Sequence, residues 1–237
     1  EFIRMGSELS CDTCYRPYLL ENILEGCTRR SDVREKISGC RIFVGTVATL
    51  SNKLELFRLK RFDVSIIDEA TQILEPQLLG VLSACDETGK NAIGKFIMIG
   101  DHKQLPAVVL QSAEQTEIYE DSLRSVGITN LKDSLFERLY RSLKLMNDEE
   151  IFSRSVDMLS KQGRMHPDVA HFSNHAFYNG KLQSLGLPHQ QDESTLEVAI
   201  DNAIRITSRM FFIPSKRESH NCSGKTNHYE ARLTAEL

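Results

Sequence analysis

Three short runs of apolar residues constrain the fold of this chain more than any other feature. They span residues 41–46, 62–68 and 95–100, and each is followed by a helical or polar segment. Strands buried on both faces of a parallel sheet show such continuous runs. Residues 72–84 lie between the second and third runs, and they carry an apolar stripe with Pro76 in the first turn, as a helix start allows. Strand, helix and strand at this spacing predict an α/β fold with a parallel sheet flanked by helices.

The remainder of the chain is less regular. An acidic, solvated excursion is predicted around residues 114–121, followed by a helix at residues 133–140. The polar segment at residues 147–150 is the predicted boundary between a first domain, residues 1–150, and a second, residues 151–237. Beyond the boundary we expect an extended stretch to residue 159, a helix over residues 167–178, strands at 196–200 and 210–213, and a last helix from residue 227.

Composition excludes several classes of protein. Hydrophobic residues make up 41% of the 237 residues and charged residues 26%, which is typical of a globular protein and excludes a disordered or collagen-like chain. No apolar run approaches the roughly 18 residues of a membrane span. The net charge is −4, whereas dedicated nucleic-acid domains are often strongly basic, so any nucleic acid must be held by a local surface.

The cysteines allow two interpretations. Cys11 and Cys14 have the two-residue gap of a zinc knuckle, but Cys27 and Cys40 stand 13 positions apart and do not supply the second pair. Reduced structural thiols are the simpler interpretation. They predict an intracellular, cytoplasmic protein, or a nuclear one in a eukaryote.

The second apolar run ends in two acids, Asp68 and Glu69. Open α/β sheets bind ligands at the carboxyl ends of their strands. Phosphoryl transfer needs one group to hold magnesium and another to position the attacking water, and these two carboxylates suit the two roles. The alternative is a solvated sheet edge without a function.

The third apolar run ends in a comparable polar segment, from Gly100 to Pro106. A glycine lets the backbone turn sharply, and polar side chains at this strand end can reach the same site as Asp68. A plain turn is the alternative, if this segment is considered alone.

Considered together, these segments resemble motifs of the superfamily 1 helicases. Asp68–Gln72 (DEATQ) and Gly100–Pro106 (GDHKQLP) resemble motifs II and III. Gln162–Pro167 (QGRMHP), continued by Phe177–Leu182 (FYNGKL), is similar to the QYRMHP segment that opens the second motor lobe in the Upf-like branch, superfamily 1B. Ser134–Leu139 (SLFERL) is similar to the helix that precedes it there. The motifs occur in the family's order.

The resemblance implies a motor of two RecA-like lobes, with ATP in the cleft between them and a single nucleic-acid strand across their top. Residues 1–150 would hold the C-terminal part of the first lobe, and residues 151–237 the beginning of the second. It implies that Asp68 coordinates Mg²⁺ through ATP and that Glu69 activates water. The other implied catalytic residues are Gln72 and Gln104, which sense the γ-phosphate, and Arg164, which reaches it from the second lobe. The implied cofactor-binding residues are Gly100, Asp101 and Gln162, and the implied nucleic-acid contacts are Thr46 and Pro106.

The chain departs from the family pattern at two points. Gly163 stands where the family usually has Tyr, and no GxxxxGK[ST] phosphate loop is present. Residues 222–226 (CSGKT) look similar to such a loop, but Ser219 stands where its first Gly should be, and no clear buried strand precedes it. The family's loop lies upstream of the motifs found here. We therefore expect a fragment of a larger helicase that works with the remaining motor domains of a parent chain.

The leading hypothesis from the sequence is an ATP- and Mg²⁺-dependent helicase that moves 5′ to 3′ along single-stranded DNA or RNA, without a membrane partner. One alternative is a RecA-like binding or regulatory module that does not hydrolyse ATP by itself. Another is a related ATPase that does not unwind. The 237-residue chain in isolation is expected to show no ATPase activity, because a nucleotide would lack the phosphate loop that cradles it.

Overall fold

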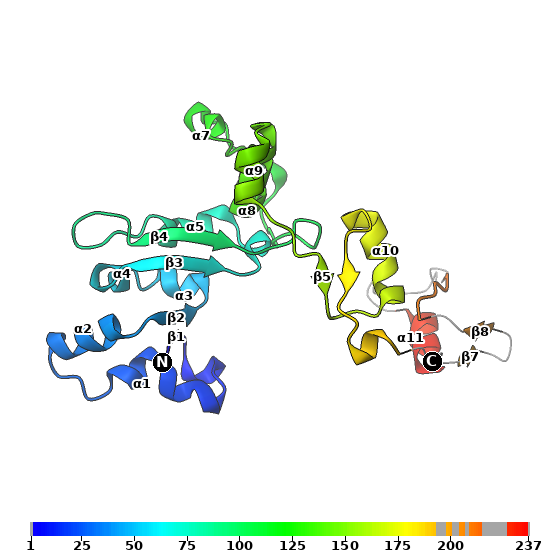
Figure 1. Cartoon of the computed structure of the whole chain (residues 1–237), viewed down its shortest axis with the longest axis horizontal. Coiled ribbons are helices and arrows are strands. Elements are labelled where there is room, and N and C mark those ends of the chain that lie inside the picture. The colour runs from blue at the N-terminus through cyan, green and yellow to red at the C-terminus, as the bar shows by residue number, and fades with distance from the viewer. Residues whose placement is uncertain (1, 193–197, 201–203, 207–208, 215–226, 237) are drawn as a thin grey trace. The chain divides into compact units, whose positions relative to one another are not determined.

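The computed structural model describes residues 2–192, 198–200, 204–206, 209–214 and 227–236. The chain divides into two compact units, Glu1–Val156 and Asp157–Leu237 (Figure 1). The two units are described one at a time.

The first unit alternates strands and helices. Its strands are β1 (Phe2–Met5), β2 (Ile42–Gly45), β3 (Phe62–Ile67) and β4 (Ile93–Met98). Its helices up to β4 are the 3₁₀ helices η1 (Glu8–Ser10), η2 (Thr13–Tyr18) and η3 (Ala70–Gln72), and the α-helices α1 (Leu20–Leu24), α2 (Arg30–Gly39), α3 (Val47–Ser51), α4 (Glu55–Leu59) and α5 (Glu75–Leu82). After β4 come α6 (Ala113–Thr116), α7 (Asp121–Ser125), α8 (Leu135–Leu145) and α9 (Glu149–Ser155).

The strands of this unit pair in parallel. β1 pairs with β2, and β3 pairs with β4, with Ile66 opposite Ile97. Parallel strands separated by helices confirm the predicted α/β fold. β1 was not predicted, because its four residues include the charged Arg4 and carry no sustained apolar pattern.

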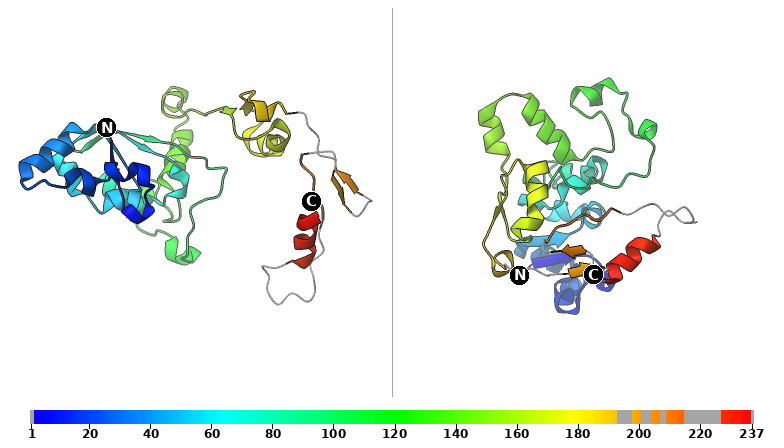
Figure 2. Two further views of the ribbon diagram at one scale, coloured as in Figure 1. Left: turned by 90° about the horizontal axis from the view of Figure 1, so that it is seen from below. Right: turned by 90° about the vertical axis from the view of Figure 1, so that its right-hand side faces the viewer.

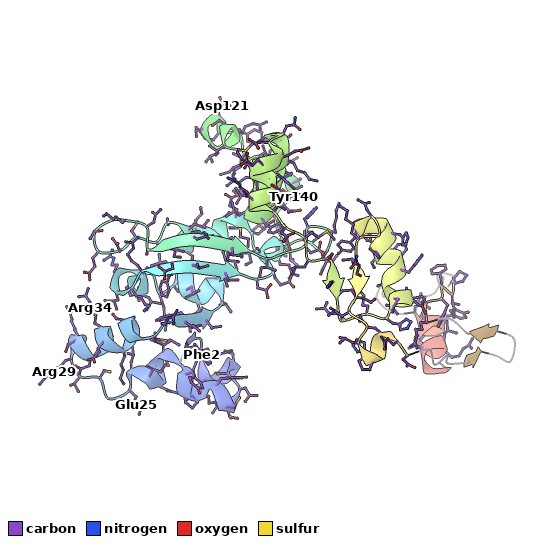
Figure 3. All side chains as sticks on the ribbon, viewed as in Figure 1. Phe2, Glu25, Arg29, Arg34, Asp121 and Tyr140 are labelled. Carbon is purple, nitrogen blue, oxygen red and sulfur yellow. The ribbon has the colours of Figure 1, made fainter. Side chains whose placement is uncertain are left out.

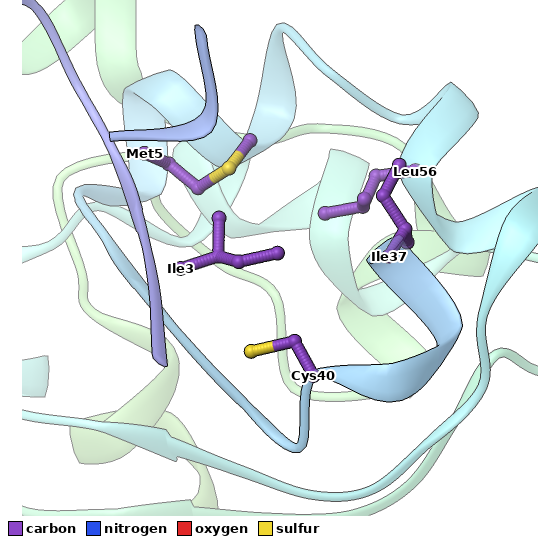
Figure 4. Close-up of a cluster of buried hydrophobic side chains, with 5 residues drawn as sticks. All are labelled: Ile3, Met5, Ile37, Cys40 and Leu56. Carbon is purple, nitrogen blue, oxygen red and sulfur yellow. The ribbon is translucent and has the colours of Figure 1, made fainter. Parts of the chain in front are cut away.

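Three clusters of buried side chains form the core of the first unit. The first joins β1, α2 and α4 through Ile3, Met5, Ile37, Cys40 and Leu56 (Figure 4). The second comprises Phe57, Val81, Ala84, Ala92 and Ile93, and the third comprises Ile67, Ala70, Leu78 and Leu135. The third cluster anchors the end of β3, because its members Ile67 and Ala70 flank the two acids that follow the strand. Leu78 is completely buried there, which stabilises the fold by about 2 kcal/mol.

The two faces of the β3–β4 pair are not equally covered. Ile67, Phe96 and Met98 lie on the face that packs against α5 and α8. On the other face, Ile66 is 65% exposed and Ile97 is 43% exposed. The expectation that these strands are buried on both faces is therefore wrong for the second half of each strand, whereas the start of the same face packs against α4.

The segment after the predicted boundary forms a helix rather than an extended stretch. Asp148 is the N-cap of α9, and its carboxylate accepts hydrogen bonds from the backbone N–H groups of Glu150 (3.1 Å) and Ile151 (3.0 Å). Acidic residues in the first turn further favour a helix N-terminus. The polar run at residues 147–150 is thus a helix start. Helices α8 and α9 lie side by side (Figures 1 and 2).

The second unit contains β5 (Lys161–Gln162), α10 (Pro167–Tyr178), β6 (Gln183–Ser184), η4 (Pro188–Gln190), β7 (Val198–Ile200), β8 (Ile204–Ile206) and α11 (His228–Glu236). β5 and β6 pair in parallel, whereas β7 and β8 are antiparallel.

Some predictions for the second unit hold and one does not. The helix predicted over residues 167–178 is confirmed, as is the last helix, α11. Only residues 198–200 of the first predicted strand are described, and they are extended. The strand predicted at residues 210–213 is wrong, since these residues pair with no other strand among the described residues, and an isolated apolar run has no ladder to join. The CSGKT segment at residues 222–226 lies outside the described residues.

A partly buried ion pair ties α5 to α8. The guanidinium of Arg138 donates two hydrogen bonds to the carboxylate of Glu75, at 2.7 and 2.5 Å, and a third to the backbone carbonyl of Val126 at 2.9 Å. The two side chains are only 17% and 12% exposed. The hydrogen bond from Glu75 raises the pKa of Arg138 above its ordinary value.

Replacing Arg138 with methionine is therefore expected to lower the free energy of unfolding by about 2 to 4 kcal/mol, because it leaves the Glu75 carboxylate partly buried without its partner. Chemical denaturation of the whole chain measures the loss. Arg154→Met is the matched control. It breaks a pair with Glu150 whose side chains are 78% and 72% exposed, which should cost less than about 0.5 kcal/mol. Equal losses for both variants would contradict the interpretation.

Candidate functional site

The end of β3 places Asp68 and Glu69 on a sharp turn. Ile67 before the turn and Ala70 after it are buried, whereas both acids are exposed. Glu69 adopts the left-handed backbone conformation, with φ of 51° and ψ of 39°. This conformation costs a residue other than glycine about 1 to 2 kcal/mol and is common at functional sites. The buried anchors on both sides hold the turn in place against that cost.

Hydrogen bonds within the turn fix the direction of its polar groups. The Asp68 carboxylate accepts a hydrogen bond from the backbone N–H of Glu69 at 3.0 Å. The carboxamide of Gln72 donates to the Glu69 carboxylate at 3.3 Å. Three of the side chains that the sequence predicts to act on a nucleotide thus lie on one exposed turn.

The end of β4 lies directly beside this turn. The backbone N–H of Ile99 donates to the carbonyl of Ile67, and the N–H of Ala70 donates to the carbonyl of Ile99, both at 2.8 Å. The β3–β4 ladder therefore continues beyond the strands into both motifs. Gly100 suits this close contact, because a Cβ there would lie 3.0 Å from the Thr71 side chain and 3.1 Å from its backbone nitrogen, which is tighter than most Cβ contacts. The DEATQ and GDHKQLP segments are thus brought together, as the sequence predicts.

Asp101 organises the loop that follows Gly100. One carboxylate oxygen accepts from the backbone N–H of Lys103 at 3.0 Å, and the other accepts from the carboxamide of Gln104 at 2.9 Å. Asp101 therefore positions Gln104. Pro106, two residues further along, is exposed.

His102, in the same loop, contacts α8. Its ring lies 4.6 Å from that of Tyr140 (Figure 3), measured between the ring centroids. Burial lowers the pKa of His102, and the neighbouring Lys103 acts in the same direction. The imidazole is therefore held in its neutral form near neutral pH and anchors the loop on the helix.

Thr46 lies at the start of α3. Its hydroxyl accepts a hydrogen bond from the backbone N–H of Thr49 at 3.2 Å and lies 2.9 Å from the Thr49 hydroxyl. The next residue, Val47, packs against the core cluster that anchors the acidic turn. Thr46 is therefore a helix N-cap, at the end of the strand that precedes β3 in the chain.

Gln162 and Arg164 belong to the second unit. The Gln162 side chain bridges its own turn, because its oxygen accepts from the N–H groups of Arg164 (3.1 Å) and Met165 (2.8 Å), and its nitrogen donates to the Met165 carbonyl at 2.8 Å. Arg164 is exposed, and its guanidinium has no hydrogen-bond partner among the described residues. The structure thus presents a cation on an organised turn, residues 162–165, which we call the Arg164 turn.

The donor set suits a nucleotide with magnesium. Mg²⁺ is usually held by one or two carboxylates together with phosphate oxygens and water, so the single exposed carboxylate of Asp68 fits that requirement. No group of three metal-ligating side chains occurs in the described part of the chain. The cysteines at positions 11, 14, 27, 40 and 85 form no disulfide with one another. No helix among the described residues has the length and apolar character to cross a membrane.

Sequence reasoning missed His189 and Gln190, two residues that contact the Arg164 turn in space. They belong to η4, and both donate or accept hydrogen bonds at the Arg164 turn, 25 to 28 positions away in sequence. No motif or periodicity marks them, so only the contact itself reveals them.

Comparisons with known proteins agree with the motifs. Residues 24–112 match one family described as AAA domain, and residues 131–237 match a second with the same description. The DNA replication ATP-dependent helicase/nuclease DNA2 of Xenopus laevis is 28% identical over 100% of this chain and 22% of its own length. The DNA polymerase alpha-associated DNA helicase A of Saccharomyces cerevisiae is 31% identical over 63% of the chain and 20% of its own length.

A third organism supplies a similar match. An uncharacterized ATP-dependent helicase of Methanocaldococcus jannaschii is 29% identical over 73% of the chain and 21% of its own length. The chain thus spans about a fifth of the length of these relatives. The two AAA-domain matches, the helicase relatives and the adjoining DEATQ and GDHKQLP turns lead to one family: the chain belongs to the Upf-like helicases of superfamily 1.

Proposed function

We propose that this chain forms part of an ATP-dependent helicase, in which ATP hydrolysis drives 5′ to 3′ movement along a single nucleic-acid strand. The observation that carries the proposal is the backbone ladder that joins the acidic turn to the Gly100 loop, through Ile67, Ile99 and Ala70. It gathers three carboxylates and two carboxamides at one edge of a parallel sheet, which is where such sheets bind ligands.

The proposed roles follow from the chemistry of each side chain. Asp68 would hold Mg²⁺ on the nucleotide, and Glu69 would accept a proton from the attacking water. Mg²⁺ bound there would neutralise negative charge on the phosphates. Gln72 and Gln104 are the neutral donors for phosphate oxygens, and the carboxylate of Asp101 keeps Gln104 in place.

The remaining roles concern the second unit and the nucleic acid. Arg164 would neutralise charge that develops on the γ-phosphate, and Gln162 would hold its turn. Thr46 and Pro106 would contact the strand, Thr46 through its hydroxyl and the helix start that it caps. Two of the relatives are named as DNA helicases, which supports single-stranded DNA over RNA as the first substrate to test.

One specific observation favours a second candidate, a module that does not hydrolyse ATP by itself. The 237 residues contain no GxxxxGK[ST] loop. Without that loop the β- and γ-phosphates lack their backbone cradle and lysine. Both candidates are compatible with a full-length protein that hydrolyses ATP and an isolated chain that does not.

Strand displacement by the full-length protein tests the proposal. We expect ATP-dependent unwinding of a duplex with a 5′ single-stranded overhang and none with a 3′ overhang. The isolated 237-residue chain serves as the matched inactive sample. ATP hydrolysis that is stimulated by the single strand, without strand displacement on either duplex, would indicate an ATPase that does not unwind. Binding of the strand without any hydrolysis by the full-length protein would favour the non-catalytic module.

A further inference from the structure

We infer that Gln190, assisted by His189, is a positioning residue that holds the Arg164 turn in the geometry required for ATP hydrolysis. The inference rests on the proposed function of Arg164 and extends it to a segment that carries no motif. Both residues lie in η4, which follows β6 in the second unit.

Gln190 is placed inside the protein and directed at the turn. It is only 3% exposed. Its carboxamide nitrogen donates to the backbone carbonyls of Gln162 at 3.0 Å and Met165 at 2.9 Å, which bracket Arg164 on either side. Its oxygen accepts from the backbone N–H of Leu187 at 3.2 Å. One buried side chain therefore links η4 to both ends of the turn.

His189 adds a contact at the middle of the same turn. Its Nε2 atom lies 2.8 Å from the backbone carbonyl oxygen of Gly163. The turn is also packed on its Gly163 side, because a Cβ on that residue would lie 3.1 Å from methyl carbons of Leu185 and Leu187. The segment at residues 185–190 thus contacts the turn at every residue except Arg164.

The hydrogen bonds of Gln190 are not needed to satisfy the carbonyl groups that they reach. The carbonyl of Met165 also accepts from the Gln162 side chain at 2.8 Å, and the carbonyl of Gln162 also accepts from the N–H of Leu185 at 3.1 Å. Removing the Gln190 carboxamide leaves neither carbonyl without a partner, so the penalty for a buried unpaired group does not arise there. What is lost is the connection between η4 and the turn, together with the acceptor of the Leu187 N–H at the N-cap of η4 itself.

This arrangement explains how an exposed arginine can act with precision. Residues 162, 163 and 165 are partly covered, while Arg164 alone in the turn is exposed. A fixed backbone reduces the ordering cost that the guanidinium pays when it engages a phosphate. A displacement of about 1 Å from a distant change can slow a reaction on the order of a hundredfold, so the support of the turn matters for rate.

Steady-state ATP hydrolysis by the full-length protein, with saturating single-stranded DNA, tests the inference. Gln190→Met keeps the side-chain volume and removes the donor. We expect kcat to fall about tenfold while KM for ATP changes less than about twofold, because the defect lies in the reacting geometry. In an Arg164→Ala background the same substitution should cause no further loss of kcat. His189→Ala, at an exposed position, should follow the same pattern with about a threefold effect.

The control and the contrary outcomes are equally specific. Asn174→Leu removes a side chain that donates to and accepts from the backbone of Leu182, at 2.9 Å each, away from the turn. It should lower the melting temperature while kcat per folded molecule stays unchanged. An equal loss of kcat from Gln190→Met in both backgrounds, or a lower melting temperature alone, would overturn the positioning role. If Gln190→Met does not fold, the positioning role is tested by comparing the effect of His189→Ala on kcat in the parent and in the Arg164→Ala background. An unchanged kcat in Arg164→Ala alone would instead show that the proposed role of Arg164 has failed, and the positioning role with it.

Discussion

Glu69→Gln in the full-length protein should reduce ATP hydrolysis by about a hundredfold or more, while ATP affinity stays within a few-fold of the parent. A carboxamide preserves the shape of the side chain but cannot accept a proton from water, and general-base catalysis contributes about 10² to 10⁴ in rate. The left-handed backbone of Glu69 makes glutamine the appropriate substitution, because its backbone preferences are close to those of glutamate. Single-turnover hydrolysis and nucleotide binding, measured on the same sample, give the two quantities.

Glu114→Gln is the matched control for this experiment. Glu114 is an exposed glutamate of the same unit, in α6, and it lies outside the acidic turn. The substitution makes the same change of charge and should leave hydrolysis unchanged. Turnover by Glu69→Gln within a few-fold of the parent would show that Glu69 has another role.

Arg164→Ala should slow hydrolysis about a thousandfold, as expected for an arginine that neutralises charge in phosphoryl transfer. Affinity for single-stranded DNA without nucleotide should change little. Arg164→Lys should restore little activity, because an ammonium group does not reproduce the planar fork of a guanidinium that spans two phosphate oxygens. The measurements are steady-state ATP hydrolysis and single-strand binding by the parent, Arg164→Ala and Arg164→Lys proteins.

A structural role for Arg164 is the competing explanation, in which it would secure the start of α10. The structure assigns that task to His166, whose Nδ1 atom accepts from the backbone N–H of Asp168 at 3.2 Å. Arg164→Ala should therefore leave the melting temperature nearly unchanged. A large loss of melting temperature with normal activity per folded molecule would overturn the catalytic interpretation.

The sequence predicted the parts of the fold and site whose signals are local. β2, β3 and β4 are short apolar runs, and the segments Asp68–Gln72 and Gly100–Pro106 begin within two residues of the ends of the last two. Because parallel strands end at the same edge of a sheet, their polar ends were expected to meet, and the ladder through Ile99 confirms it. Asp101 is predicted as a binding residue, but only the structure shows that its carboxylate accepts a hydrogen bond from Gln104.

The elements that sequence reasoning missed depend on partners far along the chain or on cap chemistry. β1 exists because it pairs with β2, forty residues away, and its own composition does not require a strand. α9 begins where a run of acids suggested a break, since the same residue types serve as helix caps. Gln190 looks like an ordinary polar loop residue until its partners are known. The division of the chain after Val156 is observed, whereas the assignment of its two units as successive motor lobes stays a prediction.

The ladder that runs past the ends of β3 and β4 also determines how this region opens. The amide hydrogens of Ile99 and Ala70 are each bonded to the opposite segment, so neither can exchange with solvent while the two segments remain joined. Native proteins open in contiguous cooperative units, and amides within one unit share one opening free energy. We therefore expect the acidic turn and the Gly100 loop to open as a single such unit, so that a perturbation that loosens one of them lowers the hydrogen-exchange protection of both.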